Sequence, residues 1–121
     1  MRASVLVVDD DATFRVTAGW LLRATGLCVV GEVGSATEAL SATLALRPDA
    51  ILLDIELPDE DGLVLAARLS RLPWRPRVLL ISSDPDAARP EDVAAAGARG
   101  FVPKHELPDA PLLRLLAGEW R

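Results

Sequence analysis

Several common features are rare or missing in this chain of 121 residues. Cys28 is the only cysteine, so no disulfide can form within the chain, as is typical of proteins in a reducing compartment. No apolar run approaches the roughly 20 residues that a membrane-spanning helix needs. The N-terminus does not resemble a signal peptide, because Asp9, Asp10 and Asp11 interrupt its first apolar run. These absences predict a cytoplasmic protein that does not bind a membrane.

The chain also lacks an excess of basic residues. Its formal net charge is -5 at pH 7, and an acidic domain of this kind is not expected to bind nucleic acid directly. Ten of the 18 acidic residues fall in three short segments, 9–11, 54–61 and 84–86. Because a solvated surface normally mixes both signs, clustered acids indicate a cation site.

Length and hydrophobic patterning predict a single domain over residues 1–121, with a last helix that runs into Trp120 and Arg121 and no second domain behind it. Short, almost wholly apolar runs, typical of strands buried on both faces, alternate with helix-like stretches. We expect strands at 5–8, 27–30, 50–53, 78–81 and 100–102. We expect helices at 12–25, 36–46, 63–72, 91–96 and 111–117. Strict alternation favours an α/β fold, in which helices cover both faces of a parallel five-stranded sheet.

Local signals mark the ends of several expected helices. Ser35, followed by Glu38 three residues later, forms a capping-box pattern. Gly26 and Gly97 follow helical runs, where a C-terminal cap favours a positive φ. Pro90 suits the first turn of the fourth helix. These signals support the expected element boundaries.

Acidic side chains follow two of the expected strands. Asp9 and Asp10 come directly after the first strand, and Asp54 comes directly after the third. If the sheet has the flavodoxin-like order 2-1-3-4-5 of a doubly wound (βα)5 fold, these strands are neighbours and ligands bind at their carboxyl ends. Two unit charges 4 Å apart repel by roughly 4 kcal/mol at an effective dielectric near 20, so the trio needs a cation or raised pKa values. All-oxygen ligands favour Mg²⁺. Asp11 is instead expected to cap the first helix.

The remaining strand ends carry matching chemistry. Ser82 ends the fourth strand with a hydroxyl donor, and Lys104 follows the fifth with a cation. Each residue alone is uninformative, because a serine there usually starts a turn and a lysine is usually solvated. Together, the strand ends offer metal ligands, a carboxylate nucleophile, a hydroxyl and an ammonium, which are the groups that phosphoryl transfer needs. The nucleophile would be Asp54, which would form an acyl phosphate.

Over its whole length the sequence resembles the receiver family of two-component signalling. The matching stretches are VLVVDDD, ILLDIELPDEDGL, VLLISS and GARGFVPK. The resemblance implies a response-regulator receiver domain, a conformational switch that accepts a phosphoryl group on Asp54 from a sensor histidine kinase. The signal would then pass to a downstream effector protein or to an output domain that this chain lacks.

The resemblance also implies roles for individual residues. Asp10 would bind Mg²⁺ directly, Asp9 would bind it largely through water, and the backbone carbonyl of Glu56 would be a further ligand. Asp54 would complete the metal site. The phosphoryl oxygens would be bound by the two remaining polar strand ends, Ser82 and Lys104.

Three positions near the strand ends qualify the resemblance. Phe101 matches the family's switch aromatic, although an ordinary core aromatic fits the sequence equally well. Lys104 is followed by His105 and not by the proline of many members, so no cis peptide is expected after it. His105 is expected to be a surface residue that begins the last helix. Glu56 lies two residues past Asp54, a position that the family uses to tune the phosphoryl lifetime.

Two other functions remain open at this point. Asp9, Asp11 and Thr13 match the DxDxT motif of haloacid-dehalogenase-like phosphohydrolases, with Asp9 as nucleophile, but that interpretation leaves Asp54 unexplained. The chain could also be a receiver-like interaction module that never accepts phosphate, but such modules usually lack an acidic residue or the lysine. A receiver would not be an enzyme beyond self-catalysed phosphotransfer and slow autodephosphorylation.

The first helix carries a candidate partner surface. A helical wheel directs one stripe toward the sheet, made of Phe14, Ala18, Leu21 and Thr25. Val16 and Trp20 then lie on the outer side, where an apolar spot favours an interaction site. The alternative is a half-covered surface tryptophan. The resemblance implies that this helix helps to dock the kinase, and that the first and last helices pair in some dimers.

Overall fold

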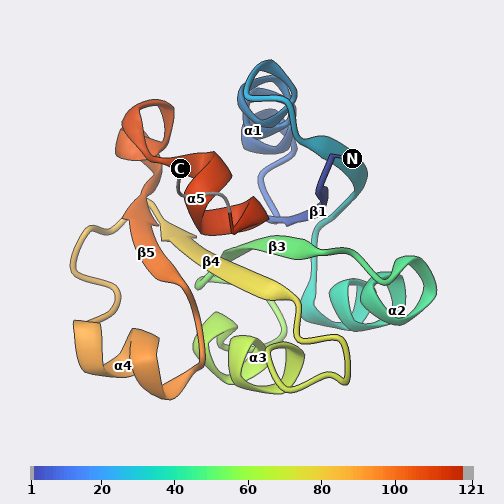
Figure 1. Ribbon diagram of the computed structural model, residues 1–121. Coiled ribbons are helices and arrows are strands. Elements are labelled where there is room, and N and C mark those ends of the chain that lie inside the picture. Colours follow the sequence, from blue (N-terminus) through green and yellow to red (C-terminus); the bar gives the residue numbers. More distant parts are fainter. Residues whose placement is uncertain (1, 119–121) are drawn as a thin grey trace.

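The computed structural model describes residues 2–118 as an alternation of strands and helices (Figure 1). In chain order the elements are β1 (Ser4–Val8), α1 (Ala12–Ala24), β2 (Cys28–Val33), α2 (Ala36–Leu46), β3 (Ala50–Asp54), α3 (Gly62–Leu69), β4 (Arg77–Ser82), α4 (Pro90–Ala95), β5 (Gly100–Pro103), the 3₁₀ helix η1 (Lys104–Asp109) and α5 (Leu112–Ala117). The strands pair in parallel in the order β2-β1-β3-β4-β5, which confirms the predicted flavodoxin-like fold. The expected course of the last helix into Trp120 and Arg121 lies outside the described residues.

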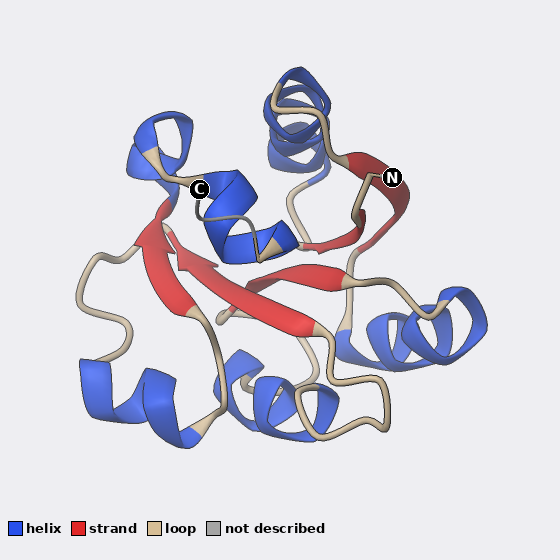
Figure 2. Ribbon diagram, viewed as in Figure 1, coloured by secondary structure: helices blue, strands red, loops and turns tan. Residues whose placement is uncertain are grey.

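The helices form a layer on each face of the sheet. In Figures 1 and 2, α1 and α5 lie above the strands, and α2, α3 and α4 lie below them. Alternate strand residues fill the two cores, as the two-residue period of a strand requires. Toward α1 and α5 the strands direct Val5, Val7, Ala50, Leu52, Leu79 and Ile81. Toward the other helices they direct Leu6, Val8, Ile51, Leu53, Val78 and Leu80. None of the helices within residues 2–118 is long and apolar enough to cross a membrane.

The central strand β3 fixes the place of the site. All five of its residues are buried, since β1 and β4 flank it and helices cover both of its faces. Val8 of β1 pairs with Leu53 of β3, so the next residues along the chain, Asp9 and Asp54, lie side by side at the carboxyl edge of the sheet. The topology therefore brings the predicted carboxylates to one edge of the sheet.

The helix-end signals are confirmed. Asp11 caps α1 by accepting hydrogen bonds from the backbone N–H groups of Thr13 and Phe14, at 3.0 and 3.3 Å. The Ser35 hydroxyl accepts a bond from the N–H of Glu38 at 3.2 Å. Helix α4 begins at Pro90, and both Gly26 and Gly97 have positive φ. The peptide bonds of the described residues are all trans.

Several predicted boundaries were wrong. Strand β2 covers Cys28–Val33 and not 27–30, because it stays paired with β1 through an irregularity in register. Helix α3 ends at Leu69, after which the N–H of Leu72 bonds the carbonyl of Leu69 in a tighter turn. His105 does not begin the last helix. It lies on the surface in η1, and Ala110 and Pro111 separate that 3₁₀ helix from α5.

The buried face of α1 is rotated from the prediction. Ala18 is buried as expected, but Gly19 and Leu22 are buried too, whereas the other predicted stripe residues are only half-buried. The space beside Gly19 is taken by the side chains of Arg23 and Glu32, which cover this part of the helix. Val16 and Trp20 do lie outward: they are 54% and 73% exposed. The tryptophan is therefore not folded over the helix edge.

Candidate functional site

Three carboxylates meet at the carboxyl edge of β1 and β3. Asp9 is fully buried and Asp54 is 3% exposed, whereas Asp10 faces solvent. Each offers an oxygen within 4.8 Å of the other two. The N–H of Asp9 bonds the Val33 carbonyl at 3.0 Å, so β1 and β2 hold its backbone in place. This is the convergence that the strand order predicted.

Lys104 brings a positive charge to the same point. It is the only lysine of the chain, and its Nζ lies 2.7 Å from Asp9 Oδ2 and 3.3 Å from Asp54 Oδ2. The ammonium also lies 4.5 Å from the centre of the Phe14 ring, a cation–π contact. Burial disfavours the charged ammonium, but the two carboxylates outweigh burial and raise the pKa of Lys104. Lys104 is thus held by the site and is not a solvated surface lysine.

The pKa of the Asp54 carboxyl is shifted toward neutral pH. Burial is the main cause that raises its pKa to about 6, and the nearby charge of Asp9 adds to that effect. A hydrogen bond from the N–H of Glu56, 3.0 Å from Oδ1, acts in the opposite direction, as does Lys104. Asp54 is therefore mostly ionised at neutral pH, and its negative charge is incompletely compensated.

The loop after Asp54 folds back tightly on the strand. Glu56 and Asp61 form an isolated antiparallel bridge, and the N–H of Gly62 bonds the Ile55 carbonyl at 2.7 Å. A Cβ on Gly62 would lie 2.5 Å from the Asp54 carbonyl oxygen and the Ile55 Cα. Only glycine allows this approach, so Gly62 shapes the loop that carries Glu56 past the carboxylates.

The fourth strand end is linked to the same loop through side chains. The Ser82 hydroxyl donates to Glu56 Oε1 at 2.9 Å and accepts from the N–H of Asp84 at 3.0 Å. Its single hydrogen is therefore engaged by Glu56. Phe101 pairs with Leu80 in the sheet. It is half-buried against the core that lies between the sheet and the α2, α3 and α4 layer. Both polar residues were predicted from the sequence, but the hydrogen bond between them was not.

Much of the acid clustering has a structural cause that the sequence does not reveal. Asp59 accepts bonds from the N–H groups of Ala36 and Thr37 at 2.8 and 3.0 Å, so it caps α2 from a different loop. These bonds lower the pKa of Asp59. Asp61 caps α3, and Glu60 pairs with Arg68 at 3.2 Å. The cation-site interpretation therefore applies to Asp9, Asp10 and Asp54, and not to the whole 54–61 segment.

The donor set fits a hard divalent cation. Within residues 2–118, the carboxylates of Asp9, Asp10 and Asp54 are the one cluster that could hold a metal ion. All of its donors are oxygens, the ligands that Mg²⁺ and Ca²⁺ prefer. The ammonium of Lys104 already balances part of this charge through two ion pairs. A parallel α/β sheet with such a charged cluster at its carboxyl edge is typical of a phosphoryl-handling protein.

Comparison with known proteins agrees with this class. Residues 5–115 match the family model described as the response regulator receiver domain. The receiver domain of NarL from Mycobacterium tuberculosis aligns with a TM-score of 0.75 and 34% identity, over 92% of this chain and 94% of that one. A LuxR-family response regulator from Aurantimonas aligns with a TM-score of 0.83 and 27% identity, over 98% and 88% of the two chains. The chain therefore belongs to the response regulator receiver family.

Curated relatives are longer than this chain. A protein described as a transcriptional regulator of Pseudomonas aeruginosa is 36% identical over 86% of this chain but 50% of its own length. BvgA, described as a virulence transcription regulator of Bordetella pertussis, is 34% identical over 88% and 51%. A protein-glutamate methylesterase of Alkalilimnicola ehrlichii is 37% identical over 86% and 27%. The chain thus spans about half or less of these relatives, and the enzyme among them extends well beyond the shared receiver domain.

Proposed function

We propose that Asp54 accepts a phosphoryl group from a histidine of a sensor kinase. An Asp54 carboxylate oxygen would attack phosphorus, form the acyl phosphate bond and displace the imidazole nitrogen as the P–N bond breaks. The observation that carries this proposal is the buried Asp54 carboxylate beside Asp9, Asp10 and Lys104. Its pKa near 6 leaves the nucleophile ionised at neutral pH.

Mg²⁺ is the cofactor that we propose for this transfer. Asp9, Asp10 and Asp54 would hold the ion together with the backbone carbonyl of Glu56. When bound, it would neutralise charge on the carboxylates and on the incoming phosphoryl group. Lys104 already contacts Asp54 Oδ2 at 3.3 Å, and after the reaction its ammonium would form an ion pair with a phosphoryl oxygen.

Ser82 and Phe101 would convert phosphorylation into a change of shape. Ser82 now donates its hydrogen to Glu56, so a bond from Ser82 to the phosphoryl group requires that contact to break. The movement would draw the β4–α4 loop toward Asp54 and bias Phe101 inward. We propose that Glu56 thereby influences how long the phosphorylated state lasts.

The phosphohydrolase alternative gains no support from the geometry. Its general acid would be Asp11, but that carboxylate accepts two backbone bonds at the N-terminus of α1. It also assigns no role to Asp54, whose carboxylate lies within 4.8 Å of those of Asp9 and Asp10. We propose a single domain over residues 1–121 that acts in the cytoplasm as a switch, with no catalysis beyond its own phosphorylation and dephosphorylation.

Mass spectrometry of the intact protein after incubation with acetyl phosphate tests this function. We expect one labile phosphoryl group to be added with Mg²⁺ and none with EDTA. Asp54→Asn should abolish the addition and preserve the circular dichroism spectrum. Asp86→Asn, which changes an exposed acid outside the site, is the matched control and should be labelled like the wild type. Undiminished labelling of Asp54→Asn would overturn the assignment.

The partners would be a sensor histidine kinase and a downstream effector or output domain. Trp20 and Val16, both largely exposed on α1, form our candidate surface for kinase docking or for a homodimer through α1 and α5. Leu113 on α5 is 41% exposed and adds apolar surface on the second helix. We propose no direct contact of this domain with nucleic acid or membrane.

Trp20→Arg separates docking from chemistry. We expect it to weaken either transfer from the cognate kinase or self-association, because tryptophan is enriched among residues that dominate interfaces. Labelling by acetyl phosphate should not change, because Trp20 does not contact the carboxylates. Transfer rates and sedimentation equal to those of the wild type would show that the exposed indole has no role in binding.

A further inference from the structure

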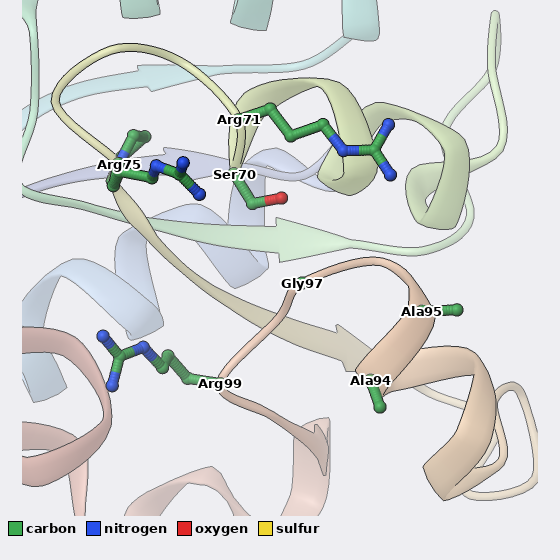
Figure 3. Close-up of a pocket in the computed structure, with 8 residues that line it drawn as sticks. Ser70, Arg71, Arg75, Ala94, Ala95, Gly97 and Arg99 are labelled. Carbon is green, nitrogen blue, oxygen red and sulfur yellow. The ribbon is translucent and has the colours of Figure 1, made fainter.

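A hollow lies at the opposite edge of the sheet from the carboxylates. It occupies about 320 Å³ between the ends of α3 and α4 and the starts of β4 and β5 (Figure 3). Its lining consists of Ser70, Arg71, Arg75, Pro76, Ala94, Ala95, Gly97 and Arg99. No role in the proposed phosphorylation falls on any of these residues.

The walls of this hollow are held in place. The Ser70 hydroxyl at the end of α3 donates to the Ala96 carbonyl at the end of α4, at 3.0 Å. Gly97 has φ +70, and a Cβ there would lie 2.6 Å from the Ser70 hydroxyl oxygen, so the two helix ends approach closely because this residue is glycine. The N–H of Arg75 bonds the Leu72 carbonyl at 2.8 Å, which fixes the turn after α3. The backbone walls of the hollow are therefore preformed, whereas the exposed side chains of Arg71, Arg75 and Arg99 would adjust around a ligand.

The charge of the hollow is not balanced. Among residues 2–118, no carboxylate lies within 4.0 Å of the guanidinium of Arg71, Arg75 or Arg99. The C-terminal ends of α3 and α4 each carry at most about half a negative charge. Three arginines therefore exceed what the two helix ends compensate by about two positive charges. This surplus occurs in a chain whose net charge is -5.

We propose that this hollow binds a small organic anion with more than one phosphate group, such as a nucleoside diphosphate. A guanidinium presents a planar fork that binds phosphate oxygens in pairs. Figure 3 shows the Arg75 side chain pointing toward Ser70, whereas the Arg71 and Arg99 side chains extend outward from the hollow in different directions. That spread suits a ligand with several phosphates better than a single small anion. The volume lies at the lower end of the range of small-molecule pockets.

Titration of ¹⁵N-labelled protein with ADP, and separately with sodium pyrophosphate, tests the proposal. The buffer contains EDTA and little salt, so that no divalent ion can draw phosphate to the Asp54 site. We expect saturable shifts confined to residues 70–76 and 94–99. Arg71→Gln combined with Arg75→Asn should weaken binding at least tenfold. Asparagine is chosen because Arg75 has φ 51, a left-handed conformation that asparagine tolerates.

A charge-matched control distinguishes a site from general attraction. Arg2→Gln combined with Arg114→Gln also removes two exposed arginines, but neither lines the hollow. Binding by this control should match the wild type, and both double variants should keep its melting temperature. Tighter binding of ADP than of pyrophosphate would support a nucleotide, and equal binding would support recognition of the phosphates alone. Equal losses in both double variants, shifts without saturation, or shifts centred on Asp54 would overturn the proposal.

Discussion

The two edges of the sheet carry opposite charges, and these charges differ in whether nearby groups neutralise them. At the carboxyl edge, acids crowd together, and most of them have partners: Asp9 and Asp54 pair with Lys104, whereas Asp59 and Asp61 cap helices. At the other edge, arginines surround a hollow in which the described residues supply no close carboxylate. Part of this separation follows from the fold, because β→α loops place helix N-termini, which favour acids, at the carboxyl edge.

The comparison shows which charges follow from the fold and which need a ligand. The negative charge of an acid at a helix N-terminus is stabilised by the N–H groups that donate to it, as for Asp11 and Asp59. The carboxylates of Asp9 and Asp54 are buried far beyond what capping requires, and a single ammonium serves both. The charge balance at the carboxyl edge therefore depends on Lys104, and a mutation can remove that residue's ammonium.

Lys104→Met should have the largest effect on stability. It leaves the buried Asp9 and Asp54 carboxylates without their ammonium, and the loss of one partner from a buried pair costs about 3–5 kcal/mol. We expect urea unfolding in EDTA to show a loss of that order, part of which Mg²⁺ restores. Arg114→Met, at an exposed position of α5, is the control and should change little. A Lys104→Met protein as stable as the wild type in EDTA would mean that the two ion pairs do not balance the site.

Asp54→Asn should have a somewhat smaller effect of the opposite sign. Folding raises the pKa of Asp54 from its ordinary value of 3.8 to about 6, so the folded protein holds the Asp54 proton more tightly than the unfolded chain does. The pH window between these two values is where this difference changes stability. The free energy of unfolding therefore falls as pH rises through this window, and the full cost is present above it. Removal of the charge should stabilise the metal-free protein by up to about 3 kcal/mol at pH 7.5, since a tenfold difference in proton affinity corresponds to about 1.4 kcal/mol.

Unfolding curves at pH 4 and pH 7.5 check this sign. The difference between Asp54→Asn and the wild type should shrink toward pH 4, because the wild-type carboxyl then becomes protonated as well. Asp86→Asn, at an exposed position, should show no such trend. A stabilisation that is the same at both pH values would contradict the titration of Asp54 as its cause.

Mg²⁺ should stabilise the wild type by mass action. At ten times its dissociation constant, an ion that binds only the folded protein adds about 1.4 kcal/mol. Asp10 is exposed but lies within 4.8 Å of the Asp9 and Asp54 carboxylates, so Asp10→Asn should not lower the metal-free melting temperature and should remove most of the Mg²⁺-dependent rise. Differential scanning calorimetry in EDTA and in millimolar Mg²⁺ measures both. An equal rise in the variant would exclude Asp10 as a ligand.

Asp59→Ala should give the smallest change. It removes an acceptor for the N–H groups of Ala36 and Thr37, so hydrogen exchange at the start of α2 should accelerate. The Asp59 loop also carries Glu56, and we expect a modest loss of Mg²⁺ affinity. Asp86→Ala is the matched control. Unchanged exchange at Ala36 and Thr37 would show that the cross-loop cap does not stabilise the helix.

The sequence predicted what depends on local pattern and topology. Apolar runs separated by helices predicted the parallel sheet, and its strand order then predicted the meeting of Asp9, Asp10 and Asp54. It could not predict that Asp59 caps a helix that begins 23 residues earlier, because that contact exists only after the loops pack. The rotation of α1 was also missed, because the contact of the helix with Glu32 exists only after the chain has folded.

The hydrogen bond from Ser82 to Glu56 also could not be predicted from the sequence. The two residues are 26 positions apart, and their side chains meet only because β3 and β4 are neighbours in the sheet. Ser82 was recognised from its place at a strand end, and Glu56 from the resemblance to the receiver family. Their direct contact links the switch hydroxyl to the loop after Asp54, and only the folded structure shows it.

The position of the phosphoryl group tests the account most directly. Acetyl phosphate with Mg²⁺, followed by borohydride reduction and peptide sequencing by mass spectrometry, converts an acyl phosphate into a stable alcohol at the residue that carried it. We predict the reduced residue at position 54, in amounts that depend on Mg²⁺. Reduction at Asp9 would instead favour the phosphohydrolase-like nucleophile, and the absence of any reduced carboxyl would contradict the phosphoacceptor function itself.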